Sequence, residues 1–578
     1  MRGLASTLAI LSLAIPTIAS LNPDTHAQHP FTSSQTQTQE EKLVQVERYD
    51  DQQVWRIDWS DHSAVNKRQI MEVIELLDLD VWHTTRSSID VRLNAQQRAI
   101  MGNIVSPALF SPFITDLQSL VDLSLDASDS HSDDDHDLGS PEEEKAGKRD
   151  LDEVSSRIFE ELLKKKKKKK GGKGKKRPQP SIPPIKIDPF NLTTIDTPFH
   201  DNFHPLKEMY KFGKTLIATF NGTRGIDIKE LNLGKTFEGN IIKGWSVKMH
   251  PDQNGTNPPK DPNPTPQPIP EPDPEDPEPT PEPLPDDPEG DPTPGLSLLN
   301  KMKKREMHGE DEDLDGVELE FVVQSGQHGR EWVGPSSALY FLHHLLLRAT
   351  TEPNSDAAIL LKSFRFTIIP QINPDGYAYS REKSRLWRKN RQDVGGKGNC
   401  LGIDLNANWG YKWRASKATA CSEGYGGKEA FEAYETKAIS EYLSSAAERG
   451  NRVRAFVDLH SYGQLFMFPF AHSCDDFPPD AEMLMEAGLG VAKAMRTQQG
   501  EGYEAGQACD LTYRAPGDAI DYTYGVTDVR WSYSAELRDT GTYGFMLPPK
   551  LIRPTADEVT AGLMYLAKFI YALEVNPP

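Results

Sequence analysis

Two stretches near the start of the chain, residues 54–59 and 89–93, alternate apolar and polar side chains as half-buried β-strands do. Between them, apolar residues recur at helical spacing from Ile70 to Leu77. Further patterns predict strands at 81–83 and 113–117 and a second helix at 99–105. This order of elements is typical of a small ferredoxin-like α+β unit, which we assign to residues 41–124.

The second half of the chain alternates apolar strand-like runs with helical patterns, for example at 338–347 and 430–443. Such alternation predicts an α/β domain with a mixed central sheet flanked by helices, and we assign it to residues 188–578. A block rich in Pro, Asp and Glu interrupts it at 251–315, where proline and like charges favour an extended chain. Because strand-like stretches lie on both sides, we expect the block to be a disordered insertion within this domain.

Two polar segments surround the first unit. Residues 21–40 are rich in Gln and Thr and are expected to be disordered. Residues 125–187 contain an acidic tract, the basic pair Lys148-Arg149 and a lysine run at 164–170. The lysine run could form a nucleic-acid or membrane patch, but a solvated charge run in a disordered linker is the favoured interpretation. A trypsin-like or dibasic-cleaving protease would cut there, so this segment is a candidate activation linker.

Residues 1–20 have the pattern of a secretory signal peptide, with Arg2 followed by an apolar stretch and small residues. A signal anchor is the alternative, but the apolar stretch is short for crossing a bilayer. No later segment has the roughly 18 consecutive apolar residues of a membrane span. The formal net charge of -21 argues against a nucleic-acid partner, and the hydrophobic fraction of 37% fits a chain with much linker.

Secretion gives meaning to two further features. An even number of cysteines favours disulfides in an oxidising compartment, and four cysteines allow three pairings. They are Cys400, Cys421, Cys474 and Cys509. Sequons for N-glycosylation begin at Asn191, Asn221 and Asn254.

Candidate metal ligands follow a strand-like stretch at 321–323. His328 and Glu331 are three residues apart, so both can reach one ion, and their nitrogen and oxygen atoms suit zinc. Such a pair also recurs by chance, and a catalytic zinc needs a third protein ligand. His460 is the best candidate, because it ends an apolar strand, where α/β sheets place their site residues.

Six motifs, met in this order along the chain, resemble those of the funnelin family of zinc metallocarboxypeptidases, which includes the pancreatic carboxypeptidases A and B. The motifs lie at residues 328–332, 373–377, 385–389, 402–406, 459–462 and 536–541. The resemblance covers the chain from about residue 199 to its end, apart from the acidic insertion. It implies the zinc carboxypeptidase fold, and it identifies the 41–124 unit as similar to the family's inhibitory propeptide.

The resemblance also implies roles for individual residues. One zinc ion would be held by His328, Glu331 and His460, and it would activate a water molecule and polarise the scissile carbonyl. Glu536 matches the general base, and Arg388 matches the residue that stabilises the oxyanion and contacts substrate. Asp404 matches the carboxylate that orients the first zinc histidine. In the family's pattern Cys400 pairs with Cys421, which leaves Cys474 with Cys509.

The substrate-binding positions of the family fall on Asn406, Tyr513 and Ile520, and an apolar Ile520 implies preference for aliphatic or aromatic C-terminal residues. One departure concerns Ala407, where the family has an arginine that pairs with the substrate's terminal carboxylate. Losing such a pair costs about 1.5–3 kcal/mol. Asn406 and Tyr513 could hold the carboxylate instead, or Lys412 or Arg414 could replace the arginine.

Two functions therefore remain. The first is a secreted zymogen that removes C-terminal, apolar residues from peptides or proteins after an activating protease has cut it. The alternative is a zinc-binding, catalytically weak or inactive protein similar to fungal metallocarboxypeptidase-like proteins of cell-wall organisation. That group is characterised by loss of the catalytic glutamate, whereas Glu536 is present here. We expect a monomer located outside the cell, in a vacuole or in the cell wall.

Overall fold

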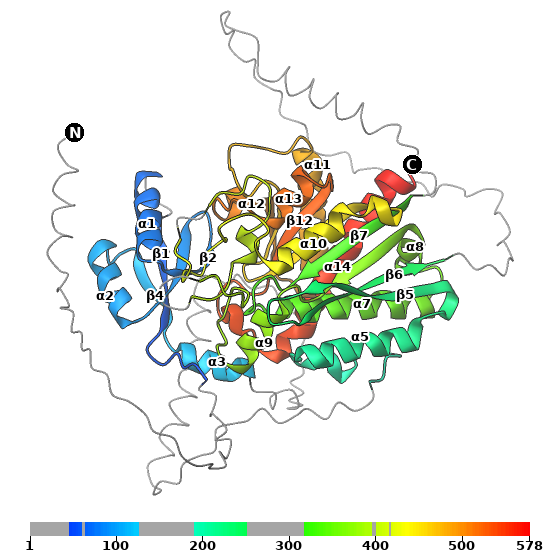
Figure 1. Ribbon diagram of the computed structural model, residues 1–578, viewed down its shortest axis with the longest axis horizontal. Coiled ribbons are helices and arrows are strands. Elements are labelled where there is room, and N and C mark those ends of the chain that lie inside the picture. The colour runs from blue at the N-terminus through cyan, green and yellow to red at the C-terminus, as the bar shows by residue number, and fades with distance from the viewer. Residues whose placement is uncertain are drawn as a thin grey trace, which may run out of the picture. The chain divides into compact units, whose positions relative to one another are not determined.

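Two β-sheets organise the part of the chain that the computed structural model describes (Figure 1). The described residues are 46–59, 64–125, 190–250, 317–395, 400–415 and 418–577. The predicted signal peptide, the 21–40 segment, the acidic insertion and nearly all of the predicted linker lie outside them. So do Lys148, Arg149 and the sequon at Asn254.

The first sheet has four strands in the order β2-β3-β1-β4. Its elements are β1 (Gln53–Asp58), α1 (Ala64–Leu76), β2 (Asp80–Thr84), β3 (Ser88–Leu93), α2 (Ala95–Ile104) and β4 (Phe110–Ile114). All of its recorded strand pairs are antiparallel. Ile57, Ile89 and Met101 are buried in its core. The predicted α+β unit is thereby confirmed.

The end of this unit differs from the prediction. A strand was expected at 113–117, but β4 ends at Ile114 and α3 (Leu117–Leu125) follows. The physical reason is a helix start at Asp116, whose carboxylate accepts hydrogen bonds from the Ser119 backbone N–H and hydroxyl. Apolar Leu117 and Val121 are then buried on one side of the helix.

The second sheet has eight strands in the order β11-β10-β12-β9-β7-β8-β6-β5. Its strands are β5 (Ile226–Lys235), β6 (Ile241–Met249), β7 (Glu318–Ser325), β8 (Phe364–Ile369), β9 (Asn451–Ser461), β10 (Leu465–Phe468), β11 (Glu504–Gln507) and β12 (Trp531–Leu537). The central strands β12, β9, β7 and β8 are parallel to one another, whereas β10 is antiparallel to β12, β6 is antiparallel to β8, and β5 is antiparallel to β6. The sheet is therefore mixed, as predicted.

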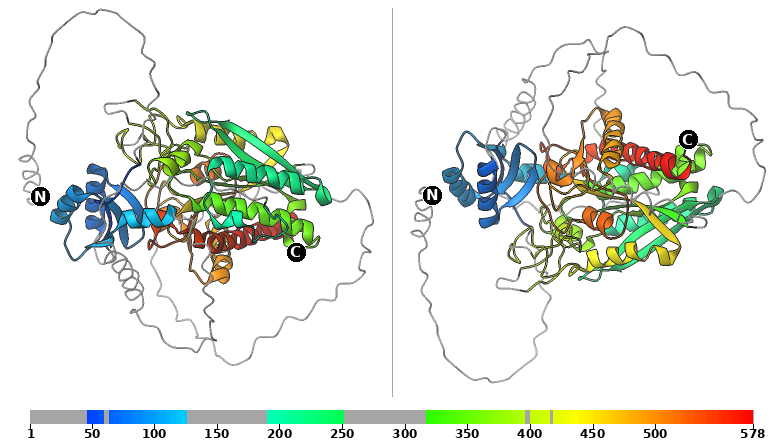
Figure 2. Two further views of the ribbon diagram at one scale, coloured as in Figure 1. Left: turned by 90° about the horizontal axis from the view of Figure 1, so that it is seen from below. Right: turned by 90° about the horizontal axis from the view of Figure 1, so that it is seen from above.

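Helices cover both faces of this sheet (Figures 1 and 2). They are α5 (Leu206–Phe220), α7 (Val333–Thr351), α8 (Asp356–Ser363), α9 (Pro374–Glu382), α10 (Tyr434–Ser444), α11 (Ala481–Gln499), α12 (Ala508–Leu511), α13 (Ala519–Gly525) and α14 (Ile552–Ile570). Successive residues of β7 point to opposite faces, since Phe321 joins the core under α5, α7 and α14, and Val322 joins the core under α10 and α13. At one point α5 approaches the sheet so closely that a Cβ on Gly213 would lie 2.0 Å from the Trp245 ring.

A third apolar cluster joins the two sheets. Tyr49, Trp82 and Leu117 of the first unit pack with Tyr462 and Phe545 of the second. Trp82 makes an edge contact with Phe545, with ring centroids 5.0 Å apart. The α+β unit therefore rests on the α/β domain through a buried surface.

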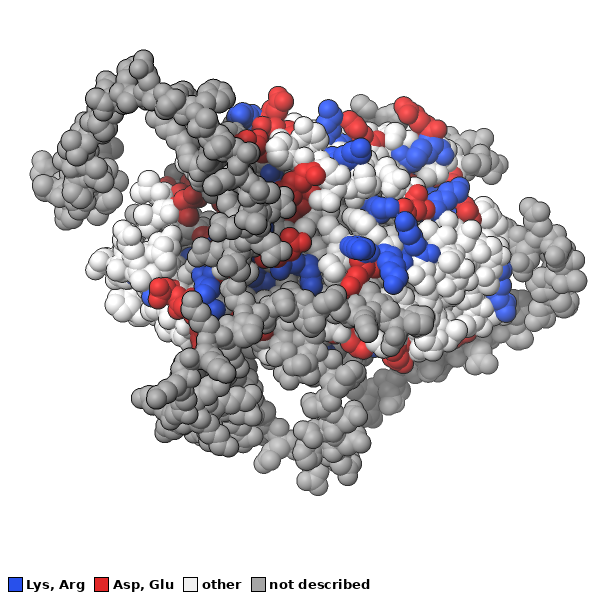
Figure 3. Space-filling model, turned by 60° about the horizontal axis from the view of Figure 1, so that its bottom comes forward, with Lys and Arg blue, Asp and Glu red and all other residues white. Residues whose placement is uncertain are grey.

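Four further features complete the description of the fold. Disulfides join Cys400 to Cys421 and Cys474 to Cys509, the pairing expected from the resemblance. Asn191 and Asn221 are exposed. Among the described helices, none is long and apolar enough to cross a membrane. On the face shown in Figure 3, the basic and acidic side chains drawn in colour are interspersed.

Candidate metal centre

The candidate ligands lie where two neighbouring parallel strands end. β7 ends at Ser325, and the loop that follows carries His328 and Glu331 before α7 begins. His460 is the penultimate residue of β9, which pairs with β7 in parallel. The loop needs a glycine at its start, because Gly326 has φ +74° and a Cβ there would lie 1.8 Å from the Gln371 side chain.

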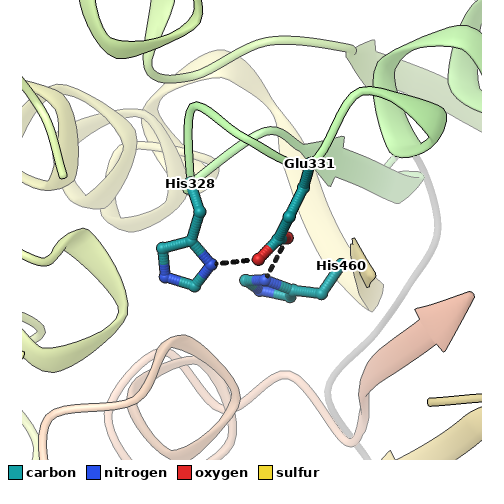
Figure 4. Close-up of side chains that lie close together, drawn as sticks. All are labelled: His328, Glu331 and His460. Carbon is teal, nitrogen blue, oxygen red and sulfur yellow. Dashed lines mark hydrogen bonds and ion pairs between the residues drawn. The ribbon is translucent and has the colours of Figure 1, made fainter. Parts of the chain in front are cut away.

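The three side chains point toward one another in a buried cluster (Figure 4). Glu331 Oε1 lies 2.6 Å from His328 Nδ1, and Glu331 Oε2 lies 3.1 Å from His460 Nδ1. One ligand atom from each residue falls within 4.8 Å of the others. Burial alone would raise the pKa of Glu331, but the two histidines hold that pKa well below its usual range. This set of two imidazole nitrogens and one carboxylate fits zinc.

Each of the two histidines is also contacted by a carboxylate at Nε2, the ring nitrogen that faces away from Glu331. His328 Nε2 lies 3.1 Å from Asp404 Oδ1, and His460 Nε2 lies 3.0 Å from Asp458 Oδ2. Each contact fixes a proton on Nε2, which leaves the lone pair of Nδ1 facing the metal position. The structure thus places Asp404 where the resemblance predicted it. Asp458 was not predicted, although it lies two residues before His460 on the same strand, where side chains share a face.

The cluster forms one wall of a cavity of about 100 Å³. The other residues expected to act at the site also line it, namely Glu536, Arg388, Asn406, Tyr513 and Ile520. Residues 81–84 of the first unit contribute to its lining as well. The structure therefore gathers the predicted metal ligands and the residues expected to act on substrate around one cavity, and the α+β unit covers part of it.

Glu536 lies on β12, directly opposite His460 on β9. Its Oε2 is buried and has no hydrogen-bond partner among the described residues. Burial raises the pKa of the Glu536 carboxyl to about 8. A carboxyl group with a free oxygen at this position is suited to exchange a proton with a bound molecule.

Arg388 lies beside the metal cluster and is the only Lys or Arg among the described residues that line the cavity. Its Nη2 donates to Asp404 Oδ2 at 3.1 Å. One carboxylate, Asp404, therefore positions both His328 and Arg388.

The predicted carboxylate-binding position is already occupied by internal contacts. Asn406 Nδ2 donates to Asp518 Oδ2 at 2.8 Å, and Asn406 Oδ1 accepts from Gln327 Nε2 at 2.9 Å and from Ala519 N at 3.1 Å. Neither Lys412 nor Arg414 is among the residues that line the cavity. The expectation that one of them replaces the missing arginine therefore has no support in the structure.

Comparison with known proteins agrees with the family resemblance of the sequence motifs. A family model described as zinc carboxypeptidase matches residues 227–562. "Inactive metallocarboxypeptidase ecm14" of Talaromyces stipitatus is 36% identical over 286 residues, which cover 46% of this chain and 48% of that protein. "Inactive metallocarboxypeptidase ECM14" of Saccharomyces cerevisiae is 35% identical over 282 residues, which cover 48% of this chain and 64% of that protein. The match thus spans about half the length of the first curated relative.

Solved structures share the fold at low identity. The crystal structure of thrombin-activatable fibrinolysis inhibitor has a TM-score of 0.57 at 19% identity, covering 90% of this chain and 98% of that one. Carboxypeptidase A from Helicoverpa armigera has a TM-score of 0.57 at 21% identity, with the same coverage. The predicted carboxypeptidase fold is thereby confirmed.

Proposed function

The chain belongs to the zinc carboxypeptidase family, and from this premise we propose that it is a zinc-binding, carboxypeptidase-like protein with weak or absent exopeptidase turnover. Its cavity binds a peptide or protein, and its cleavage chemistry is limited by poor recognition of a free chain end. The names of the curated relatives, which describe them as inactive metallocarboxypeptidases, support this choice over an efficient enzyme.

One observation carries the proposal: Ala407 follows Asn406, whose Oδ1 accepts from Gln327 and Ala519 and whose Nδ2 donates to Asp518. A terminal carboxylate in the cavity would therefore find no arginine at 407, and at 406 an amide that already donates one hydrogen bond to Asp518. Arg388 remains, but Asp404 already holds it. A charge-assisted hydrogen bond of the missing kind contributes about 1.5–3 kcal/mol, so its loss weakens binding of a chain end by roughly 10–150-fold.

Zinc would be held by His328, Glu331 and His460, and when bound it supplies Lewis-acid catalysis and activation of water. The chain's own residues contribute in two ways. Glu536 offers a carboxyl oxygen without a partner for accepting a proton. Arg388 offers a positive charge toward the cavity for an oxygen that becomes negative.

A second candidate function is an efficient carboxypeptidase, and the presence of Glu536 favours it. The residue lies opposite His460, which supports it as the base that peptide hydrolysis would need. In that case the chain would act as a zymogen, with residues 81–84 of the α+β unit limiting access to the cavity until a trypsin-like or dibasic-cleaving protease cuts the linker.

The remaining parts of the proposal concern location and partners. Two disulfides support passage through an oxidising compartment, and secretion to the medium, a vacuole or the cell wall follows from the signal-like residues 1–20. The sequons at Asn191 and Asn221 lie on the surface, where glycans could be attached. A monomer that acts in cell-wall organisation by binding a peptide or protein fits these features.

The test measures zinc content and turnover on the full chain, before and after trypsin treatment. We expect one zinc ion per chain and a release of C-terminal Phe or Leu from blocked dipeptides that equals the release by Glu536→Ala. Release by the wild-type chain that far exceeds that of Glu536→Ala would overturn the proposal in favour of the efficient enzyme. Absence of bound zinc would overturn both candidate functions, because each requires the metal.

Placing an arginine at position 407 tests whether the missing arginine is what limits turnover. Ala407→Arg should gain at least about tenfold in kcat/KM over the wild-type chain, because one charge-assisted pair is restored. Ala407→Gln is the matched control, since it adds a long polar side chain without charge. A gain in neither variant would show that the missing arginine does not limit turnover.

A further inference from the structure

A buried glutamine to which the resemblance gives no role lies between the metal cluster and the position predicted to meet a chain end. Gln327 directly precedes His328 in the loop after β7, and its side chain is fully buried. The amide hydrogen-bonds three side chains that lie 79 to 131 positions further along the chain. This one side chain therefore connects the metal-binding loop with β9 and with the segment that carries Asn406.

The orientation of the Gln327 amide is fixed by a group that can only donate. Trp409 Nε1 donates to Gln327 Oε1 at 3.1 Å, and an indole N–H cannot accept. The amide nitrogen therefore serves the other two partners, donating to Asp458 Oδ2 at 2.5 Å and to Asn406 Oδ1 at 2.9 Å. With the two ends exchanged, the amide oxygen would face a carboxylate and the amide N–H would face the indole N–H. Only one orientation satisfies all three contacts.

The position of Asp458 depends on this amide. Asp458 Oδ2 accepts from Gln327 and lies 3.0 Å from His460 Nε2. Asp458 Oδ1 is buried and has no hydrogen-bond partner among the described residues. Apart from the histidine that it orients, the Asp458 side chain thus has one recorded donor within the described ranges, and that donor is Gln327.

The two carboxylates that contact the candidate zinc histidines are held in different ways. Asp404 accepts from the Arg388 guanidinium at 3.1 Å in addition to its contact with His328. Asp458 has no recorded contact with a lysine or arginine in the described part of the chain, and a neutral amide takes that place. Loss of the amide should therefore loosen the second histidine and leave the first one in position.

We propose that Gln327 is a positioning residue that holds Asp458 in contact with His460. Its other N–H holds the Asn406 side chain, so one amide fixes both the metal centre and the position predicted to meet a chain end. The inference rests on the proposed function, because it takes the site to bind zinc. It adds the residue on which the orientation of one zinc ligand depends.

The test measures zinc affinity of the full chain by chelator competition and records the visible absorption of its cobalt(II) form. Gln327→Met keeps the length of the side chain and removes its three hydrogen bonds. We expect about tenfold weaker zinc binding, because loss of a group that orients a metal ligand typically costs 10–100-fold. The cobalt absorption bands should also shift, since they report the arrangement of the ligand atoms, which a loss of stability alone does not change.

Gln324→Met is the matched control. Gln324 is also a fully buried glutamine of the same chain segment, at the end of β7. Neither polar atom of its side chain has a hydrogen-bond partner among the described residues, so the same substitution removes no recorded bond. Zinc affinity and the cobalt spectrum should equal those of the wild type. Wild-type values for Gln327→Met, or equal effects of the two substitutions, would overturn the proposal.

A combination with Asp458→Ala shows whether the effect passes through the carboxylate. In that background Gln327→Met should weaken zinc binding by less than about twofold, because its partner is already gone. The same tenfold loss in both backgrounds would show that Gln327 acts by another route and would overturn the proposal.

Trp409→Phe decides the matter if Gln327→Met does not fold. It leaves Gln327 in place and removes the donor that orients its amide, so zinc binding should weaken by at least about twofold and the cobalt bands should shift. Wild-type values would overturn the proposal. Absence of zinc from the wild-type chain would overturn the proposed function and this inference together, whereas release of C-terminal residues that depends on Glu536 would overturn the proposed function alone.

Discussion

Asp80 on β2 and Arg330 in the metal-binding loop form a buried ion pair that links the α+β unit to the α/β domain. Arg330 Nη1 donates to both carboxylate oxygens of Asp80 at 3.0 Å. Arg330 is fully buried, and Arg92 contacts the same carboxylate at 2.8 Å. Because Arg330 lies between His328 and Glu331 in the sequence, the first unit contacts the loop that would hold zinc.

Asp80→Asn should destabilise the chain, because it removes the carboxylate that pairs directly with the buried guanidinium of Arg330. Removing one partner of a buried pair costs about 3–5 kcal/mol. We expect a lower urea midpoint and faster proteolysis of the α+β unit. Asp50→Asn is the control, since Asp50 pairs with Arg48 at the surface, where both side chains are more than half exposed, and its loss should change stability little. Equal effects of the two variants would contradict the assignment.

The carboxylates of Asp404 and Asp458, which contact the two candidate zinc histidines, give a second prediction. Asp404→Asn and Asp458→Asn should each weaken zinc binding by about 10–100-fold, because each side chain orients one imidazole. Competition with a chelator measures the affinity. Asp404 also holds Arg388, whereas Asp458 contacts Gln327 Nε2 at 2.5 Å. Zinc affinity unchanged in both variants would show that the histidines are oriented without them.

Most of the fold could be predicted from local patterns. The strand at 54–59 and the helical spacing after Ile70 correspond to β1 and α1, because each element buries one face and its period appears in the sequence. The apolar stretch at 241–249 is β6. α3 was missed because a capping aspartate, rather than the apolar pattern before it, determines where the chain turns.

The metal cluster could be predicted, but the carboxylates around it only in part. His328, Glu331 and Asp404 fall within recognisable motifs, whereas Asp458 contacts His460 two residues away on the same strand, and Asp518 contacts a residue distant in sequence. The Asp518 contact with Asn406, for example, joins residues that are 112 positions apart. No local period reports such a contact, so the structure was needed to show that Asn406 is occupied.

The two disulfides should differ in their effect on the metal site. Replacing either pair by alanine should cost about 3–4 kcal/mol of stability, because the bridges close loops of similar length, with sequence separations of 21 and 35. The Cys400–Cys421 loop contains Asp404, so its opening should also weaken zinc binding. The Cys474–Cys509 pair is the matched control, and equal zinc affinity in both double variants would contradict this prediction. Urea unfolding and chelator competition measure the two effects.

Glu435 on α10 should make stability depend on pH. Its side chain is fully buried, Oε2 accepts from Asn390 Nδ2 at 2.7 Å, and Oε1 has no partner among the described residues. Burial raises the pKa of Glu435 from 4.5 to about 7. The folded state therefore keeps this proton at pH values where the unfolded state has lost it.

The sign of the effect follows from that difference. Below about pH 4.5 both states are protonated, and the contribution of Glu435 to stability is complete. Between about pH 4.5 and 7 only the unfolded state ionises, so the free energy of unfolding falls, by at most about 3 kcal/mol. Glu435→Gln cannot ionise and should lose less stability than the wild-type chain between pH 5 and pH 8. Glu441→Gln, exposed on the same helix, should behave as the wild type, and urea unfolding at both pH values distinguishes the three chains. Parallel pH profiles for the wild type and Glu435→Gln would show that the Glu435 carboxyl titrates normally.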